Sequence, residues 1–261
     1  KSLVKGLLDS NMDIIALCNF PQEDVKMLKS WGATVLPFML DSKISPIRDL
    51  LSIFRLIRIL KKHRVDIIHC HGFRAGTIGR VAALLAQCKC VYTMHNFLPP
   101  NLGMRKREIA VFIEGLLSRA TQKIITVSAA LKMEATDTLG IDPNKINVIY
   151  NGIDLPYPAK MGKKVREEWG VKEGEKLIGT VARLIPSKGV DILLEAADLI
   201  FRANPGIKIM IVGDGPHEAL LRAKANTINH GKNIIFVRYS EYILYYYDAF
   251  DIFVLPSLSE G

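Results

Sequence analysis

The stretch GTVARLIPSKGVD, residues 179–191, decides the fold of this chain. It contains the end of a short apolar run, residues 176–182, then a turn with a proline, and then the start of an amphipathic segment near Gly189. A strand, a tight turn and a helix in this order form the repeating unit of parallel α/β sheets. The turn carries Arg183 and, five residues later, Lys188. A guanidinium and an ammonium beside a helix N-terminus are suited to binding phosphate oxygens, although two solvated surface cations are the plainer alternative.

The same alternation of short apolar runs and helix-length amphipathic segments extends in both directions from this stretch. Most of the apolar runs are continuous, which is typical of parallel strands that are buried on both faces. The pattern therefore predicts an α/β fold with doubly wound, Rossmann-like parallel sheets. The expected strands are residues 12–18, 33–38, 65–70, 90–94, 123–127, 146–150, 176–182, 207–212, 233–237 and 251–256. The expected helices are residues 22–31, 45–64, 75–87, 104–119, 128–138, 189–203, 216–230 and 240–248.

The segment NGIDLPYPAK, residues 151–160, interrupts both periodicities with a glycine and two prolines and predicts a domain boundary. We expect a first domain over residues 1–153 and a second over residues 154–261. The chain begins without Met in what reads as the second half of an amphipathic helix, and it stops at PSLSEG directly after an apolar strand. We therefore expect a fragment that lacks the first strand of the first domain and the later part of the second.

A second strand-to-helix turn, in IMIVGDGPHEALL at residues 209–221, contains Gly213 and Gly215. The two glycines permit a tight turn and a close approach of the backbone to a ligand. Because Glu218 replaces the third glycine of the dinucleotide fingerprint, a classical NAD site is disfavoured, and a purely structural βα turn is the alternative. The chain also lacks the GxxxxGK[ST] pattern of a Walker A loop.

Taken in order, these two turns and five further stretches resemble the retaining GT-B glycosyltransferases of family 4. The resemblance covers nearly the whole chain, and the combination is specific where each stretch alone is weak. It implies two Rossmann-like domains that face each other across a cleft, of which the C-terminal one holds a nucleotide-sugar and the N-terminal one presents the acceptor. The matching stretches are VDIIHCHGFRAGTIGRVAA (65–83), VYTMHN (91–96), IITVSAALK (124–132), VIYNGID (148–154), GTVARLIPSKGVDILLEA (179–196), IVGDGP (211–216) and DIFVLPSLSEG (251–261).

The resemblance also implies roles for individual residues on the donor side. Arg183 and Lys188 fall on the family's basic pair, which grips the donor diphosphate and stabilises the charge that develops on the leaving group. Glu260 falls on the first glutamate of the E-x(7)-E motif, near the transferred sugar, and the second glutamate falls beyond the end of the chain. The two glycines of the second turn match a turn near the donor. Arg238 falls where the family approaches the nucleotide base, in a stretch RYSEY that replaces the usual glycine-containing turn.

Three histidines lie near the expected carboxyl ends of neighbouring strands. His69 and His71 are two residues apart on one strand, so both point to the same face and Cys70 points to the other, and His95 ends the next strand. A zinc site is disfavoured because Cys70 faces away and no carboxylate cluster is nearby, and hydrogen-bonded histidines at a packed edge are the plain alternative. In the family, the histidine of the VYTMHN-like stretch reaches the cleft beside the sugar. The resemblance thus places His95 first, and His71 second, on the acceptor side.

The net charge is distributed unequally along the chain. Residues 1–152 contain 21 Lys and Arg against 12 Asp and Glu, which is +9, whereas residues 153–261 contain 14 of each kind. A long helix over residues 45–64 and the basic triplet at residues 105–107 hold much of the excess. These cations can bind an anionic membrane surface, which fits a lipid-linked or membrane-proximal acceptor; a crossover helix with a solvated basic end is the alternative. Nucleic acid is disfavoured because no interleaved aromatic residues or recognisable module accompany the charge.

The composition is that of a globular protein, with 261 residues of which 49% are hydrophobic and 23% charged. Four cysteines without a CxxC pair indicate a reducing compartment, and no apolar run is long enough to span a membrane. We expect a cytoplasmic, hexosyltransferase-like enzyme of polysaccharide biosynthesis that lies peripherally at the inner face of the membrane. Its substrate is a nucleotide-sugar, and no cofactor or metal is expected.

Two other functions and two mechanisms remain open from the sequence. A GT-B nucleotide-sugar epimerase needs the donor but no acceptor, and a non-catalytic module binds a sugar-nucleotide or an anionic surface without turnover. No GxSxG pattern indicates a serine hydrolase. The sequence shows no clear nucleophile for a covalent double displacement. A front-face mechanism does not need one, because it depends mainly on positioning and on stabilisation of the leaving group. The sequence does not decide between these two mechanisms.

Overall fold

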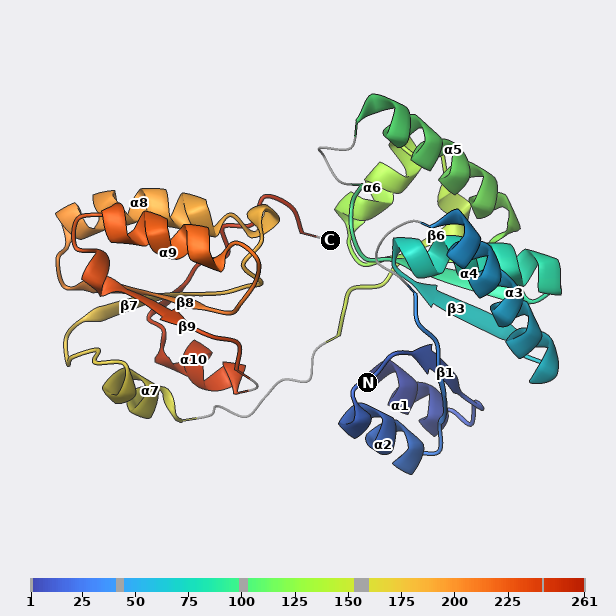
Figure 1. Cartoon of the computed structure of the whole chain (residues 1–261), viewed down its shortest axis with the longest axis horizontal. Helices are drawn as coiled ribbons and strands as arrows, with labels where there is room; N and C mark the ends of the chain where they lie inside the picture. Colours follow the sequence, from blue (N-terminus) through green and yellow to red (C-terminus); the bar gives the residue numbers. More distant parts are fainter. Residues whose placement is uncertain (1, 41–44, 99–102, 153–159, 241, 261) are drawn as a thin grey trace. The chain divides into compact units, whose positions relative to one another are not determined.

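The computed structural model describes residues 2–40, 45–98, 103–152, 160–240 and 242–260 (Figure 1). The chain divides into two compact units, residues 1–150 and 151–261. The boundary expected between residues 153 and 154 lies outside the described residues. Among the described residues, no helix is both long enough and apolar enough to cross a bilayer.

The main sheet of the first unit has four parallel strands in the order β3-β4-β5-β6. On one of its faces Cys70, Tyr92 and Ile124 are buried against three helices that follow the strands. Side chains alternate along a strand, so His69 and Thr93 lie on the opposite face. The strands are β3 (Ile67–His71), β4 (Lys89–Met94), β5 (Lys123–Thr126) and β6 (Ile146–Val148). The helices are α4 (Phe73–Ala86), α5 (Met104–Ala120) and α6 (Ala129–Asp137).

A separate two-stranded parallel sheet precedes this one in the chain. The long helix α3 (Pro46–Lys62) packs against α4 and buries Leu56 and Leu60 beside Phe38 at the end of the small sheet. Arg55 reaches back from α3, donates a hydrogen bond of 2.9 Å to the carbonyl of Pro37 and lies over the Phe38 ring. The elements of this part are α1 (Ser2–Asp9), β1 (Ile15–Cys18), α2 (Gln22–Ser30) and β2 (Thr34–Pro37).

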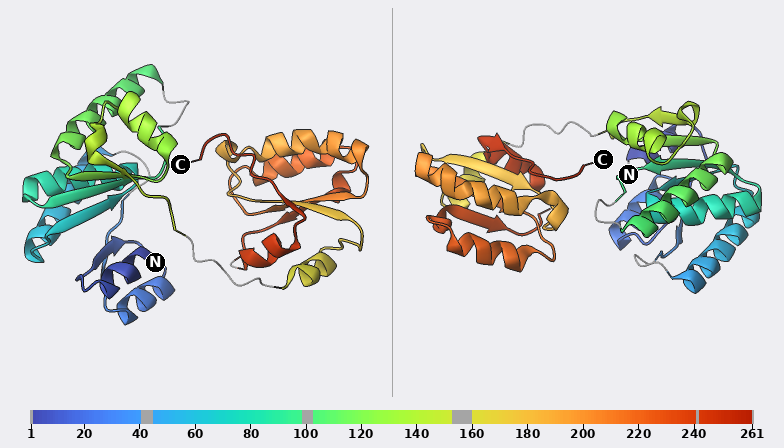
Figure 2. Two further views of the ribbon diagram at one scale, coloured as in Figure 1. Left: turned by 180° about the vertical axis from the view of Figure 1, so that it is seen from behind. Right: turned by 90° about the horizontal axis from the view of Figure 1, so that it is seen from above.

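The second unit has one four-stranded parallel sheet in the order β10-β7-β8-β9, covered by helices on both faces (Figures 1 and 2). Ile209 and Ile211 face α8 and α9, while Met210 and Val212 face α7 and α10. Burial on both faces explains why the strands read as continuous apolar runs. The strands are β7 (Lys176–Val181), β8 (Ile207–Val212), β9 (Ile234–Val237) and β10 (Ile252–Phe253). The helices are α7 (Gly162–Glu168), α8 (Val190–Ala203), α9 (Glu218–Thr227) and α10 (Ile243–Ala249).

The expected α/β fold with parallel sheets is confirmed, and the differences concern the ends of some elements and a few short elements that were not expected. The strand expected at residues 251–256 is too long, since β10 covers only Ile252–Phe253 and the following residues leave the sheet. The helix expected at 216–230 is also too long, because Ile228 is extended and a 3₁₀ turn follows it. Helix α7 was not expected from the sequence. Three 3₁₀ turns were not expected either: η1 (Pro143–Lys145), η2 (Pro186–Lys188) and η3 (Gly231–Asn233).

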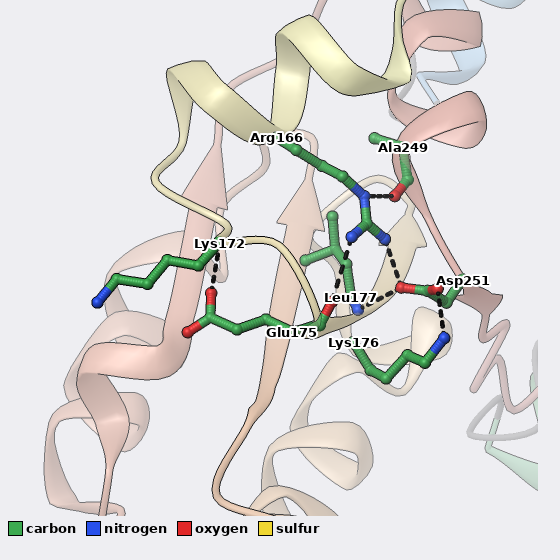
Figure 3. Close-up of polar contacts among 7 residues, drawn as sticks. All are labelled: Arg166, Lys172, Glu175, Lys176, Leu177, Ala249 and Asp251. Atoms are coloured by element: carbon green, nitrogen blue, oxygen red, sulfur yellow. Dashed lines mark hydrogen bonds and ion pairs between the residues drawn. The ribbon is translucent and has the colours of Figure 1, made fainter.

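A polar cluster attaches α7 to the sheet of the second unit (Figure 3). The Arg166 guanidinium donates to the carbonyl of Ala249 at 2.8 Å and forms an ion pair with Asp251. Asp251 also accepts hydrogen bonds from the backbone N–H of Leu177 at 2.8 Å and from Lys176 at 3.1 Å. Burial alone would raise the pKa of Asp251. The hydrogen bonds and the ion pair lower it by a larger amount, so the pKa falls from its ordinary value of 3.8 to about 2. The cluster therefore joins the helix that begins this unit to the amino end of β7 and to the segment before β10.

Candidate functional site

Two turns at the carboxyl ends of β7 and β8 are joined through their backbones. The N–H of Leu184 donates to the carbonyl of Asp214 at 2.8 Å, and the N–H of His217 donates to the carbonyl of Leu184 at 3.0 Å. A Cβ on Gly213 or Gly215 would overlap the carbonyl oxygens of the first turn. Only glycine allows this approach, so the two glycines hold the second turn against the turn that carries Arg183.

The cationic turn after β7 is η2, and it ends at Gly189, which has a φ of +61°. A Cβ on Gly189 would overlap the carbonyl of Pro256, and the N–H of Leu258 donates to the carbonyl of Ser187 at 2.9 Å. The segment after β10 therefore lies directly on η2. This packing is the reason that the strand expected at residues 251–256 ends early.

The same segment brings Glu260 to Lys188. The Lys188 Nζ lies 2.6 Å from Glu260 Oε1, and the two side chains are 24% and 45% exposed. The hydrogen bond from Lys188 holds the pKa of Glu260 below its ordinary value. The two residues were both singled out from the sequence, but they are 72 positions apart and the sequence did not indicate their contact.

Arg183 and Arg238 lie at the carboxyl ends of β7 and β9, which flank β8 in the same sheet. Arg183 is exposed just after β7, and Arg238 is exposed just after β9. The N–H of Gly213 donates to the carbonyl of Val237 at 2.9 Å, which ties the β8 turn to the residue before Arg238. Within the described residues, neither guanidinium has a hydrogen-bonded or ion-paired partner. Both charges are thus available to an anionic ligand at this edge of the sheet.

The histidines of the first unit also come together. His71 Nδ1 lies 3.0 Å from His95 Nε2, and His69 Nε2 lies 2.7 Å from Thr93 Oγ1. The ring centroids of His69 and His71 are 4.2 Å apart, and those of His71 and His95 are 5.3 Å apart and stacked. The two strand histidines therefore share one face, as the alternation predicts. Cys70 lies buried on the other face, close to Gly79 of α4.

Burial and mutual repulsion keep these rings uncharged. Burial, followed by the neighbouring His69 and His95, lowers the pKa of His71 to about 4. Burial lowers the pKa of His95 as well, and burial and then His95 lower that of His69. At neutral pH the cluster is consequently a set of neutral imidazoles, each with one donor and one acceptor nitrogen. Thr93 was not expected in the site, because a lone threonine in an apolar strand gives no signal in the sequence.

Comparison with family models decides the identity of the chain. Residues 1–156 match the model of Glycosyltransferase Family 4, and residues 162–261 match that of Glycosyl transferases group 1. The chain belongs to glycosyltransferase family 4. The two matches adjoin close to the division between the two compact units.

Among curated relatives of this family 4 chain is the UDP-Gal:alpha-D-GlcNAc-diphosphoundecaprenol alpha-1,3-galactosyltransferase of Escherichia coli. It is 34% identical over 226 residues, which cover 84% of the chain and 58% of the relative. The capsular polysaccharide biosynthesis glycosyltransferase CapM of Staphylococcus aureus is 23% identical over 268 residues, covering 99% of the chain and 69% of the relative. The chain thus spans less than two thirds of the E. coli protein's length.

Solved structures show that the family 4 chain has the GT-B glycosyltransferase fold. The Anabaena protein HepE, in complex with UDP-glucose, superposes with a TM-score of 0.78 at 21% identity, covering 98% of this chain and 69% of HepE. Sucrose-phosphate synthase from Thermosynechococcus elongatus superposes with a TM-score of 0.69 at 18% identity, covering 95% of this chain and 76% of the synthase.

Proposed function

We propose that this family 4 chain belongs to a retaining glycosyltransferase that moves a sugar from a nucleotide-sugar to a glycan or lipid-linked acceptor. The observation that carries the proposal is the contact between Lys188 and Glu260 at the carboxyl edge of one parallel sheet, on the segment after β7 that also carries Arg183 and beside two glycine-dependent turns. The relatives add chemical support. The E. coli relative is named as a UDP-Gal-dependent enzyme, and HepE was solved with UDP-glucose.

On the donor side, Arg183 and Lys188 stabilise negative charge on the diphosphate. When the bond between the anomeric carbon and the diphosphate oxygen breaks, negative charge builds up on the departing diphosphate. The exposed Arg183 offers a planar fork of donors to phosphate oxygens, and Lys188 offers a mobile point charge. Removing one donor to a developing oxyanion typically costs about 2.7–4 kcal/mol of transition-state stabilisation. We assign this task to the two side chains, without a metal or other cofactor.

Three further residues complete the donor side of the proposal. Glu260 accepts a hydrogen bond from Lys188 and, in this proposal, binds the transferred sugar. Gly213 and Gly215 keep their turn against the segment that carries Arg183, which brings that turn to the donor side. Arg238 lies at the next strand end and faces the nucleotide part of the donor.

On the acceptor side, His95 and His71 line the first unit's carboxyl edge. Their neutral rings can exchange hydrogen bonds with hydroxyl groups, which is the chemistry that a glycan acceptor offers.

A membrane-bound acceptor is supported by one face of α3. Ile47, Leu50, Leu51 and Phe54 recur at helical spacing, and they are 76%, 53%, 63% and 52% exposed. The exposed cations Arg58, Lys61 and Lys62 follow on the next turns. An exposed apolar stripe with adjacent cations fits an anionic bilayer surface, where each cation contributes about 1 kcal/mol. We propose that this face binds the inner surface of the cytoplasmic membrane peripherally.

The proposed function is tested by calorimetric titration of the full chain with UDP, UDP-glucose and UDP-galactose. Lys188→Ala should weaken UDP binding at least about tenfold, because a charge-assisted hydrogen bond to phosphate is lost. Lys232→Ala is the matched control, since Lys232 is exposed in η3 at the amino end of β9. Equal UDP affinity in the wild type and Lys188→Ala would remove the donor assignment.

The two alternatives give different outcomes in a product assay. Mass spectrometry of the full chain with nucleotide-sugar and undecaprenyl-diphosphate-linked N-acetylglucosamine should show a mass increase of one hexose on the lipid. Isomerisation of the donor in the absence of acceptor would instead indicate an epimerase. Tight donor binding without any product would indicate a binding module.

A further inference from the structure

In the His71–His95 pair, one nitrogen of each ring remains unused by the described part of the protein. His71 Nδ1 and His95 Nε2 are joined at 3.0 Å, so each ring has one nitrogen left, Nε2 of His71 and Nδ1 of His95. Across the described residues neither of these nitrogens makes a further hydrogen bond. The His71 residue is exposed and His95 is half-buried, so a ligand can reach the pair.

The contact links the protonation of the two rings. Two neutral imidazoles that share a hydrogen bond have one proton between the facing nitrogens. If His71 Nδ1 carries that proton, His71 Nε2 is an acceptor and His95 must carry its own proton on Nδ1. If His95 Nε2 carries it, the two outer roles are exchanged. In both cases the protonation of His71 Nδ1 determines which nitrogen of His95 carries its proton, and the outer nitrogen of His95 can exchange a hydrogen bond with a hydroxyl group, which both donates and accepts.

We propose that His71 is a positioning residue that holds His95 in one neutral tautomer through their shared hydrogen bond, so that the outer nitrogen of His95 can meet hydroxyl groups of the acceptor glycan. The identity of the ligand rests on the proposed function, whereas the tautomer of His95 is a property of the chain alone.

The surroundings support a fixed neutral pair. His69 lies with its ring centroid 4.2 Å from that of His71, and its own Nε2 is held by Thr93 Oγ1. The N–H of Gly72 donates to the carbonyl of Thr93 at 3.0 Å, so the end of β3 is fixed beside β4. Among the described residues, His69 and His95 are the ionisable groups that act on His71, and both disfavour its protonation. A doubly protonated pair would lose the shared hydrogen bond, since both facing nitrogens would be donors.

Asparagine and glutamine at position 71 test the roles of the two ring nitrogens of His71 separately. The side-chain amide of His71→Asn can take the place of Nδ1 and keep the bond to His95, whereas that of His71→Gln reaches the place of Nε2 and loses this bond. We expect His71→Asn to retain kcat/KM within about threefold, and His71→Gln and His71→Ala to lose on the order of tenfold or more, as is common for residues that orient a functional histidine. The pH dependence of kcat/KM should shift in the last two variants only.

Nitrogen-15 spectra of the histidine rings in the labelled full chain give a readout that needs no substrate. In the wild type and His71→Asn, His95 should show one protonated and one unprotonated nitrogen with well-separated shifts; in His71→Ala the two shifts should approach each other. His230→Ala, which removes an exposed histidine of the second unit, serves for assignment and as a control.

Either of two results overturns the proposal. Unchanged His95 shifts in His71→Ala would mean that His71 does not set the tautomer. Retained activity in His71→Gln with loss in His71→Asn would mean that His71 contacts the ligand directly. If the chain has no transferase activity at all, the shifts still report on the tautomer, so the failure of the proposed function is distinguishable from the failure of this inference.

Discussion

Single residues decide where the backbones of the second unit can touch. Gly189, Gly213 and Gly215 each lie against a carbonyl oxygen of another segment, and any Cβ there would overlap it. The sequence pointed to these glycines as turn residues. The partner of Gly189 was not predictable, because Pro256 lies in a segment that reads as part of a strand. The cations Arg183 and Lys188 were found because their turn follows a strand, whereas the Lys188–Glu260 contact depends on that distant packing.

Gly189→Ala should destabilise the second unit more than Gly170→Ala does. Both residues have a positive φ, +61° and +65°, so both substitutions carry a left-handed penalty of about 1–2 kcal/mol. A Cβ at position 170 meets open space, but one at position 189 overlaps the Pro256 carbonyl, which adds about 1–3 kcal/mol of overpacking. The free energies of unfolding in urea measure the difference. Equal losses in the two variants would contradict the described contact.

At the scale of elements, the strands were predictable and their surroundings were less so. The β-α-β alternation indicated parallel strands, and all described strand pairs are parallel. Helix α7 was missed because its sequence, GKKVREE, has little apolar periodicity. Its position depends instead on tertiary contacts of Arg166, which a sequence pattern does not display.

Acid should weaken the second unit through Asp251. Its pKa of about 2 in the folded state is lower than the ordinary value of 3.8, so its contribution is present above about pH 4 and is lost as pH falls toward 2. We expect a loss of about 1–2 kcal/mol over this range, reduced from the full linkage value because the carboxylate is partly exposed. Urea unfolding between pH 2 and 5, followed by the fluorescence of Trp169, measures it.

Asp251→Asn should remove this pH dependence and lower stability at pH 7. Glu173→Gln is the control, because Glu173 is exposed in the loop before β7. An unchanged pH profile in Asp251→Asn would show that other carboxylates govern the acid transition.

Leu51→Glu on α3 should reduce binding of the full chain to vesicles that contain anionic lipid. The substitution places a negative charge in the apolar stripe that we propose binds an anionic surface, so under that proposal it would lose burial and add repulsion. Flotation with phosphatidylglycerol-containing vesicles at low salt is the measurement, and a reduction of at least about fivefold in bound protein is expected.

The matched control is Leu199→Glu. Leu199 is 68% exposed on α8 of the second unit, against 63% for Leu51. If the two variants lose vesicle binding equally, or if the wild type does not float at all, α3 is not the membrane-binding face.

At the scale of the whole molecule, charge and architecture are distributed differently between the two units. The excess of nine positive charges lies within residues 1–152, whereas residues 153–261 are neutral overall. Composition therefore shows which part carries the excess positive charge. It could not indicate how the strands are grouped, because an alternation of strands and helices does not specify neighbours. The first unit's strands form two sheets and the second unit's strands form one.

The ion pair between Lys188 and Glu260 has a consequence for how a ligand would arrive. The Lys188 ammonium has the Glu260 carboxylate beside it, so a phosphate bound there under the proposed function would replace one counterion by another. The lysine is oriented toward the edge of the sheet before the ligand comes, and little side-chain freedom remains to be lost. The Glu260 carboxylate displaced by that phosphate would then be free to accept a hydrogen bond from the group attached to the phosphate. Under the proposed function, this one contact would couple the binding of the anion to the release of a hydrogen-bond acceptor.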